Sequence, residues 1–412
     1  MKDRTIVLFE DVYTYHLYPF HLVRPVCDMA SGMFTLYERM ARLYPQSRIE
    51  ILCRPEIRDL VRESGRFLFD ESAFKHAERY VFINARTAFA ARHRFDIDTC
   101  CIEQDTLVYL HVGPGRISED WSQRDFLDGE CLEKARMLGL DERRPEHKLF
   151  QYPWDIVNHV GKAIEHDALI AAPVWTQPGE GMLGDRIALG PDVRVDPGCI
   201  LDSRQGPVIL EAGVSVSQRS IITGPAWIGA GASIDAARIH SGVSIGQGCR
   251  IGGEVECSIV YPWTNKHHDG FLGHACVGSW VNIGAMTTNS DLRNDYGEIT
   301  VRMQGREFRT GQIKLGVMIG DFSKLGIGLL LNTGTVLGVG ANLWFDGALI
   351  KGEVPSFVWG GAAPWSEYRI NKFLDTMQTV MQRRGQKPGD ALRKRLLDLH
   401  AETGDQRRNG SG

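Results

Sequence analysis

Three histidines lie within eight residues of one polar stretch, namely His267, His268 and His274. A neutral imidazole can remove a proton near pH 7, so the cluster is suited to general acid–base chemistry. Small residues follow, among them Gly284 and Ala285, and backbone N–H groups at small residues can stabilise an oxyanion. Transfer of an acyl group from a thioester to an amine needs such a base and such donors, so the cluster is suited to that reaction. A surface histidine near a turn is the plain alternative for His268.

A six-residue spacing of apolar residues frames this cluster on both sides. Two runs of five keep the step without interruption, Leu210, Val216, Ile222, Ile228 and Ile234, then Ile319, Leu325, Leu331, Leu337 and Leu343. Such a unit fits a short strand followed by a tight turn, where glycine takes dihedrals that larger residues resist. Three units close a triangular coil, and stacked coils bury a continuous core. The repeat therefore predicts a left-handed parallel β-helix over about residues 183–350, rather than a β-sandwich with coincidental spacing.

The period is broken between residues 290 and 315 and then resumes. This break predicts a segment that projects from the prism. Long excursions from a rigid scaffold are often functional, although an insertion tolerated at a turn is the alternative.

The rest of the chain predicts one domain before the repeat and a helical segment after it. The length of 412 residues exceeds the size at which one core usually stops growing. Over residues 1–175, apolar runs alternate with stretches long enough for helices, which predicts an α/β domain. Residues 355–412 form the expected helical tail, with an amphipathic helix over about 366–383. The polar end, 406–412, is expected to lack order.

Charge and composition exclude several classes of partner. A net charge of −4 leaves no electrostatic footprint for a nucleic acid or an anionic membrane. We find no signal-peptide core and no membrane-spanning run, so we expect a cytoplasmic protein. The nine cysteines form no C-x-x-C pair and are expected to be reduced. No metal-ligand set is assigned from their spacing.

The polar stretch resembles the acetyltransferase core of bifunctional N-acetylglucosamine-1-phosphate uridyltransferases. The shared pattern is H-x-x-x-x-G-x-x-x-[IV]-G-x-x-x-N-[IL]-G-A, read here as His268, Gly273, Val277-Gly278 and Asn282-Ile283-Gly284-Ala285. The resemblance implies that His268 is the general base and that Asn282 contacts the sugar or the pantetheine arm. It also implies that Gly284 and Ala285 contact acetyl-coenzyme A. The amine acceptor would be a hexosamine-1-phosphate.

The same family has a sugar-contacting asparagine a few residues further on. Asn289 and Asn294 both fit that role here, and the sequence does not choose between them. The resemblance also implies a homotrimer, in which coils of neighbouring chains form the cleft.

The N-terminal domain is similar to the Rossmann-like fold of sugar-1-phosphate nucleotidyltransferases. In that family a strand leads into G-x-G-T-R, whose backbone approaches the nucleotide phosphates. Here Glu10 and Asp11 follow the strand, and the glycine loop is missing. Arg24 is the candidate phosphate-facing cation, with Arg86 as a second, and Mg²⁺ is an implied cofactor of this domain. Whether the domain still makes a nucleotide sugar from a sugar phosphate and a nucleotide is left open.

Two other classes of function remain alternatives. One is a sugar-nucleotide-binding scaffold with degenerate catalysis, which the missing glycine loop favours. The other is a zinc enzyme similar to γ-class carbonic anhydrases, in which His268 and His274, six residues apart, hold zinc between chains. The zinc alternative leaves the segment 282–285 unexplained.

Overall fold

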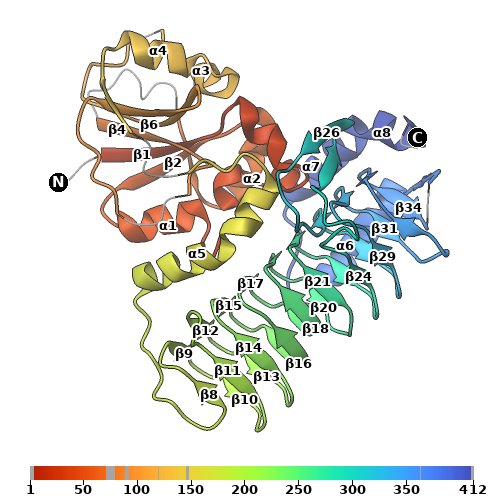
Figure 1. Ribbon diagram of the computed structural model, residues 1–412. Coiled ribbons are helices and arrows are strands. Elements are labelled where there is room, and N and C mark those ends of the chain that lie inside the picture. Colours follow the sequence, from red (N-terminus) through yellow and green to blue (C-terminus); the bar gives the residue numbers. More distant parts are fainter. Residues whose placement is uncertain are drawn as a thin grey trace. The chain divides into compact units, whose positions relative to one another are not determined.

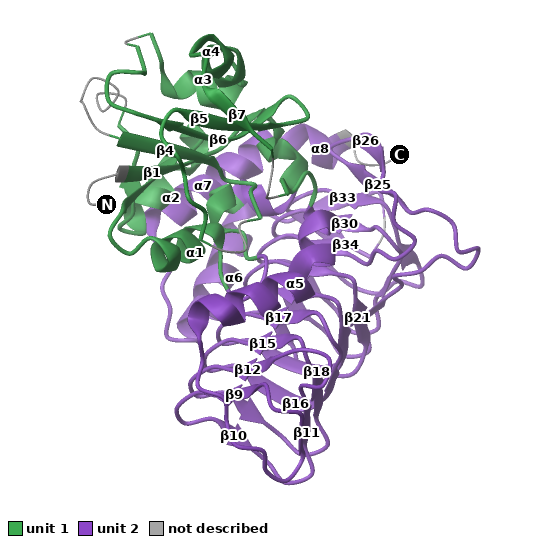
Figure 2. Ribbon diagram, turned by 60° about the vertical axis from the view of Figure 1, so that its left-hand side comes forward, with its two compact units in different colours: residues 1–17, 23–30, 34–152 green, residues 18–22, 31–33, 153–412 purple. Residues whose placement is uncertain are grey.

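The chain forms two compact units (Figure 2). The computed structural model describes residues 4–70, 79–88, 92–118, 120–144, 148–361 and 363–409. The first unit comprises Met1–Leu17, Val23–Ala30 and Phe34–Tyr152, and the second comprises Tyr18–Leu22, Ser31–Met33 and Pro153–Gly412. The units thus divide at residue 152, whereas the sequence suggested a boundary near 175. The reason is that helix α5 (Pro153–Ala171) belongs to the second unit, where its Gly161 approaches Gly242 and Pro225.

A mixed sheet forms the centre of the first unit (Figure 1). Its strands are β1 (Arg4–Phe9), β2 (Arg48–Leu52), β3 (Phe67–Leu68), β4 (Arg79–Asn84), β5 (Thr99–Glu103), β6 (Thr106–Val112) and β7 (Asp141–Arg143). Their order is β3-β2-β1-β4-β6-β5-β7. β1 runs parallel to β2 and β4, so the carboxyl ends of these three strands meet at one edge of the sheet.

Short helices connect these strands, which confirms the predicted α/β class. They are α1 (Leu36–Leu43), α2 (Arg58–Glu63), α3 (Gln123–Asp128), α4 (Cys131–Met137) and the 3-10 helices η1 (Val12–Leu17), η2 (Phe20–Val23), η3 (Val26–Asp28) and η4 (Pro55–Ile57). α1 begins at Leu36 because Thr35 and Glu38 form a capping box. Phe82 of β4 stacks on Phe126 of α3 with ring centroids 4.7 Å apart, and both side chains are buried.

The second unit is a parallel β-helix with three faces. The first face holds β9 (Ile187–Leu189), β12 (Val208–Leu210), β15 (Ala226–Ile228), β17 (Val243–Ile245), β19 (Ile259–Val260), β22 (Cys276–Val277), β27 (Met318–Ile319), β30 (Val336–Leu337) and β33 (Glu353–Val354). The second holds β10 (Arg194–Val195), β13 (Ser215–Val216), β16 (Ser233–Ile239), β18 (Arg250–Glu256), β20 (Asn265–Lys266), β23 (Asn282–Ile283), β28 (Lys324–Leu325), β31 (Asn342–Leu343) and β34 (Val358–Gly360). The third holds β8 (Met182–Leu183), β11 (Ile200–Asp202), β14 (Ile221–Thr223), β21 (Phe271–Gly273), β24 (Thr288–Asn289), β29 (Leu330–Leu331) and β32 (Leu349–Ile350), and the second halves of β16 and β18 continue onto it.

The apolar residues of the repeat form the core of this prism. Every residue of the two predicted runs is buried, with at most 3% of its surface exposed. Burying each such side chain contributes about 1.5–3 kcal/mol, so the continuous column stabilises coils that could not fold alone. The predicted left-handed parallel β-helix is confirmed.

The excursion leaves the prism after β24 and returns before β27, as the broken period predicts. It carries an antiparallel hairpin of β25 (Thr300–Met303) and β26 (Arg306–Arg309). A bridge between Leu292 and Lys314 closes its base.

Three helices follow the last coil and a short strand β35 (Ser366–Glu367). They are α6 (Ile370–Gln382), α7 (Asp390–Glu402) and α8 (Gly404–Asn409). The expected helix near 366–383 is thus confirmed as α6. Residues 406–409 belong to α8, so the expectation that they lack order was wrong; 410–412 lie outside the described residues. Within the described part of the chain, every helix is too short or too polar to span a bilayer.

Candidate active site

His268 lies at the edge between the second and third faces of the prism. Residues 267–270 connect β20 to β21 at this corner, and residues 284–287 form the next corner of the stack. We call these two corners the histidine edge. The amide N–H of Met286 donates to the carbonyl of Asp269 at 2.8 Å, which stacks one corner on the other. Gly270 has φ 131°, and a Cβ there would come within 2.2 Å of the Thr287 carbonyl oxygen, so the corner requires glycine.

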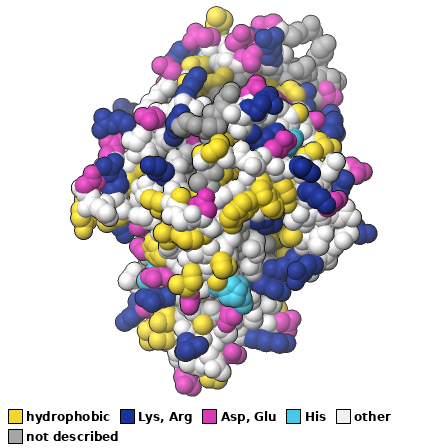
Figure 3. Space-filling view, turned by 90° about the vertical axis from the view of Figure 1, so that its right-hand side faces the viewer, with side chains coloured by type: hydrophobic (Ala, Val, Ile, Leu, Met, Phe, Trp, Pro, Cys, Tyr) yellow, Lys and Arg dark blue, Asp and Glu magenta, His cyan; other side chains and the backbone are white. Residues whose placement is uncertain are grey.

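The imidazole of His268 is exposed at this edge. Among the described residues, no side chain or backbone group forms a hydrogen bond with its ring nitrogens. Its ring lies 5.0 Å from that of His267, which in turn pairs with Asp235 at 3.2 Å. Histidines do reach the surface on one face of the molecule, beside hydrophobic and acidic side chains (Figure 3). The exposed ring of His268 is thus accessible to a ligand.

Lys266 holds this corner from inside the prism. It is in register with Ile251, an inward-facing core residue, and is 2% exposed. Its Nζ donates to the carbonyls of Gly252 at 2.7 Å and His268 at 2.9 Å. Burial lowers the pKa of Lys266 to about 8. Sequence reasoning missed this residue, although Lys266 stands six positions before Leu272 and thus occupies an apolar position of the repeat.

Asn282, Gly284 and Ala285 lie on the coil that follows His268. Asn282 is exposed, and its Oδ1 accepts a hydrogen bond from Nδ2 of Asn265 at 2.9 Å. A Cβ on Gly284 would lie 2.5 Å from the carbonyl group of Gly326, so coil stacking alone accounts for this glycine. Ala285 is half-buried at the corner itself. The structure thus brings Gly284 and Ala285 to the same edge as His268, and it places Asn282 on the adjoining strand β23 of the second face.

The two candidate asparagines differ in how they are used. Asn289 is 4% exposed, and its side chain accepts from the N–H and donates to the carbonyl of Gly273, each at 3.0 Å. Asn294 is exposed on the excursion and lines a cavity of about 440 Å³ together with Asp295, Asn332 and Thr333. The side chain of Asn289 is therefore used in hydrogen bonds within the fold, whereas Asn294 faces a cavity that a ligand can fill.

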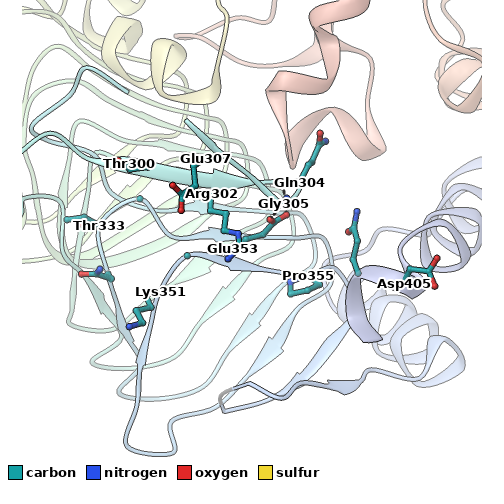
Figure 4. A pocket seen from close by; sticks show the side chains of 14 residues that line it. Thr300, Arg302, Gln304, Gly305, Glu307, Thr333, Lys351, Glu353, Pro355 and Asp405 are labelled. Carbon is teal, nitrogen blue, oxygen red and sulfur yellow. Dashed lines mark hydrogen bonds between the residues drawn. The ribbon is translucent and has the colours of Figure 1, made fainter. Parts of the chain in front are cut away.

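A second cavity of about 700 Å³ lies beside the first, and the two share Thr300, Asn332 and Thr333. Figure 4 shows Thr300 and Arg302 reaching it from the hairpin, with Lys351 and Glu353 on the coil below. These cavities adjoin the excursion, at the edge between the third and first faces. Within one chain, strand β21 of the third face lies between His268 and the edge that bears these cavities.

In the first unit, polar side chains gather at the carboxyl ends of β1, β2 and β4. Glu10 accepts from the guanidinium of Arg54 at 2.6 Å, and Asp11 accepts from that of Arg86 at 2.6 and 3.0 Å. These four side chains are at most 7% exposed. Arg86, a candidate phosphate ligand, is therefore an internal partner of Asp11, and sequence reasoning missed the role of Arg54.

Arg24 lies in the same unit and is half-buried. Its carbonyl accepts from Arg54 at 3.2 Å. Burial raises the pKa of Asp28, while Arg66 and Arg24 act in the opposite direction, which puts the Arg24 charge near that carboxyl group. Its role towards a phosphate stays a prediction.

Comparison with known proteins finds a matching family model and several relatives that are similar over part of the chain. Residues 6–172 match the family model described as sugar nucleotidyl transferase. The bifunctional protein GlmU of Acidithiobacillus ferrooxidans is 32% identical over 173 residues, 41% of this chain and 34% of that protein. A bifunctional sugar-1-phosphate nucleotidylyltransferase/acetyltransferase of Sulfurisphaera tokodaii is 30% identical over 101 residues, 24% of this chain and 25% of that protein. The chain thus spans about a third of the first relative's length and a quarter of the second's.

Among solved structures, UDP-N-acetylglucosamine acyltransferase from Campylobacter jejuni is 12% identical over 53% of this chain and 96% of that chain, with a TM-score of 0.20. A score this low supports no conclusion about the chain.

The fold defines a two-part protein, in which an α/β unit precedes a hexapeptide-repeat β-helix, and the matching residues 6–172 make the first part similar to sugar nucleotidyl transferases. Over part of its length, the chain is similar in sequence to the GlmU bifunctional proteins.

Proposed function

We propose that the β-helix transfers an acetyl group from acetyl-coenzyme A to the amine of a hexosamine-1-phosphate. The observation that carries the proposal is the histidine edge, where the corner that bears the exposed His268 is joined to the next corner, with Gly284 and Ala285, by the backbone hydrogen bond from Met286 to Asp269. The similarity to the Sulfurisphaera tokodaii protein, which is named a nucleotidylyltransferase/acetyltransferase, supports the same reaction class.

The chemistry requires one base and one set of oxyanion donors. His268 removes a proton from the acceptor amine as its nitrogen attacks the thioester carbonyl carbon. Backbone N–H groups at the corner stabilise the tetrahedral oxyanion. When the intermediate collapses, the carbon–sulfur bond breaks and the imidazolium returns its proton to the leaving thiolate. The products are the N-acetylated sugar phosphate and coenzyme A.

Substrate binding needs more than one edge of the prism. Asn282 and the backbone of Gly284 and Ala285 lie beside His268 and suit the pantetheine arm. Asn294 lines its cavity at the edge that bears the excursion. In a homotrimer, different edges of neighbouring prisms face one another, so the Asn294 edge of one chain can approach the His268 edge of the next. We therefore assign the sugar contact to Asn294 rather than to Asn289.

The first unit is proposed to bind a sugar phosphate or a nucleotide, with nucleotidyl transfer as a second activity. Arg24 is the proposed phosphate contact. The residues at its sheet edge do not fit Mg²⁺, because Glu10 and Asp11 already pair with arginines. Within the described residues, no trio of metal-ligating side chains gathers in this unit. We derive no step through this ion.

A release assay tests the proposal on the full chain. Purified protein is mixed with acetyl-coenzyme A and a panel of amino-sugar 1-phosphates, and free thiol and N-acetyl product are both measured. We expect thiol release that matches product with glucosamine-1-phosphate or a close analogue. A parallel screen for pyrophosphate release from nucleoside triphosphates tests the first unit. Absence of thiol release with every amino sugar would overturn the acetyltransferase and leave the binding scaffold.

A further inference from the structure

A cluster of metal-ligating side chains lies away from the histidine edge, where the third face of the prism turns into the first. Glu256 ends β18 and is followed by Cys257, and His274 follows β21 on the next coil. One ligand atom from each of the three lies within 4.8 Å of the other two. In the described residues this is the single group of three or more such side chains. Residues of two consecutive coils thus converge on one point.

The backbone holds both central residues in an unusual conformation. Cys257 has φ 40° and His274 has φ 47°, a region that side-chain-bearing residues rarely adopt. The His274 N–H donates to the Glu256 carbonyl at 3.0 Å, which fixes one corner on the other. Other corners of the prism have the same conformation, for example at Ala236, Trp263 and Trp280, so it belongs to the turns of the fold.

A hydrogen bond to Asp291 orients the ring of His274 for binding a cation. Its Nδ1 lies 2.7 Å from Oδ2 of Asp291, one of the first residues of the excursion. A carboxylate on one ring nitrogen orients the other towards a metal, as in many zinc sites. The Cys257 Sγ lies within 4.8 Å of a ring nitrogen of His274, and its thiol donates to the Ser241 carbonyl at 3.6 Å. A metal ion can take the place of the thiol proton.

The three side chains of this cluster can be reached from solvent. Side-chain exposure is 32% for Glu256 and 11% for His274. All nine cysteines fall within the described residues, and Cys257 is the one that is not buried. Lys314 lies 3.7 Å from Glu256, but its side chain is 45% exposed and can turn away.

We propose that Glu256, Cys257 and His274 bind one Zn²⁺, which fastens two coils to the base of the excursion through Asp291. A thiolate with an imidazole selects a borderline-soft ion such as Zn²⁺ over Mg²⁺ or Ca²⁺. Three protein ligands leave a fourth position for water. Binding releases the Cys257 proton to solvent. This site lies within one chain and uses His274 without His268, so it differs from a zinc site shared between chains. It does not depend on the proposed acetyl transfer.

Cobalt loading of the full chain tests this assignment. Chelator-treated protein is titrated with Co²⁺ and then with competing Zn²⁺. We expect one Co²⁺ per chain, with a thiolate-to-cobalt absorption band that Zn²⁺ removes. Cys257→Ser and His274→Gln are expected to lose both the stoichiometric ion and the band. His240→Gln is the matched control, because His240 pairs with Glu254 at 2.8 Å without a thiol nearby. It should bind Co²⁺ as the unsubstituted protein does.

A second measurement needs no variant and so does not depend on folding. Zn²⁺ should protect Cys257 of the unsubstituted protein from iodoacetamide, as read by mass spectrometry of its peptide. Equal alkylation with and without Zn²⁺ would overturn the site. So would a thiolate band that survives in Cys257→Ser, or metal binding no greater than in the variants. Rapid alkylation without metal binding would instead indicate a thiol activated by His274 and Asp291.

Discussion

The sheet edge of the first unit and the histidine edge of the β-helix both gather polar side chains, and they treat them differently. At the sheet edge, Glu10 and Asp11 are buried and their charges are matched by arginines of the same chain. At the histidine edge, the buried cation Lys266 holds only backbone carbonyls, and His268 is left exposed. The contrast shows that charged residues at the expected position of a site can serve the fold alone. A candidate site is instead marked by a polar group that the fold holds in place and leaves exposed.

The largest loss of stability is expected at the sheet edge of the first unit, where buried charges pair with one another. Arg86→Met removes the partner of buried Asp11, and loss of one member of a buried pair costs on the order of 3–5 kcal/mol. Hydrogen exchange of the β1 and β4 peptides should rise strongly. Arg136→Met is the control, since Arg136 pairs with Asp105 at the surface, and it should leave exchange nearly unchanged. Unchanged exchange in Arg86→Met would remove the distinction between the two edges.

Asn289 and Asn294 allow the same comparison inside the β-helix, between a side chain bonded within the fold and an exposed one. Asn289→Ala leaves the buried N–H and carbonyl of Gly273 without their side-chain partner, at a cost of roughly 1–3 kcal/mol. Thermal unfolding should reveal this loss. Asn294→Ala should leave the melting temperature unchanged and raise KM for the sugar phosphate. The opposite pattern would reassign the sugar contact to Asn289.

Much of this contrast lies beyond what the sequence can predict. The six-residue spacing was enough for the β-helix because each coil buries its apolar residue in the same way, whatever its neighbours are. The spacing from His268 to Ala285 likewise places both on one edge, since consecutive coils repeat the same corners. Pairings such as Glu10 with Arg54, or His274 with Asp291, depend on strand order and coil register. Lys266 was missed because a charged residue at an inward position reads as an interruption of the repeat.

A smaller effect is expected from Lys266, and it depends on pH. The pKa of Lys266 in the folded chain is about 8, below the ordinary 10.5. Between these values the unfolded chain binds more protons, so the cost of burying the charge is full below pH 8 and declines as pH rises towards 10.5. Lys266→Met removes this cost. Its melting temperature should therefore exceed that of the unsubstituted protein by the largest margin at neutral pH. If this margin is the same at neutral and alkaline pH, the buried charge on Lys266 is contradicted.

The same variant tests the positioning of His268. Without the bond to its carbonyl, the corner loses a tether, and kcat for acetyl transfer should fall roughly 10-fold to 100-fold. Lys324→Met provides the control for pH dependence, because burial also lowers the pKa of Lys324 to about 8. Its Nζ donates to the Trp280 carbonyl instead. An unchanged kcat in Lys266→Met would show that the tether does not matter.

The most direct test of the whole account is the turnover of His268→Ala at saturating acetyl-coenzyme A and amino sugar phosphate. His267→Gln serves as its neighbour control, because that ring pairs with Asp235. If the exposed imidazole is the base, His268→Ala should lose at least about 100-fold in kcat at an unchanged melting temperature, while His267→Gln stays close to the unsubstituted protein. Turnover of His268→Ala within about twofold of the unsubstituted protein would contradict the account.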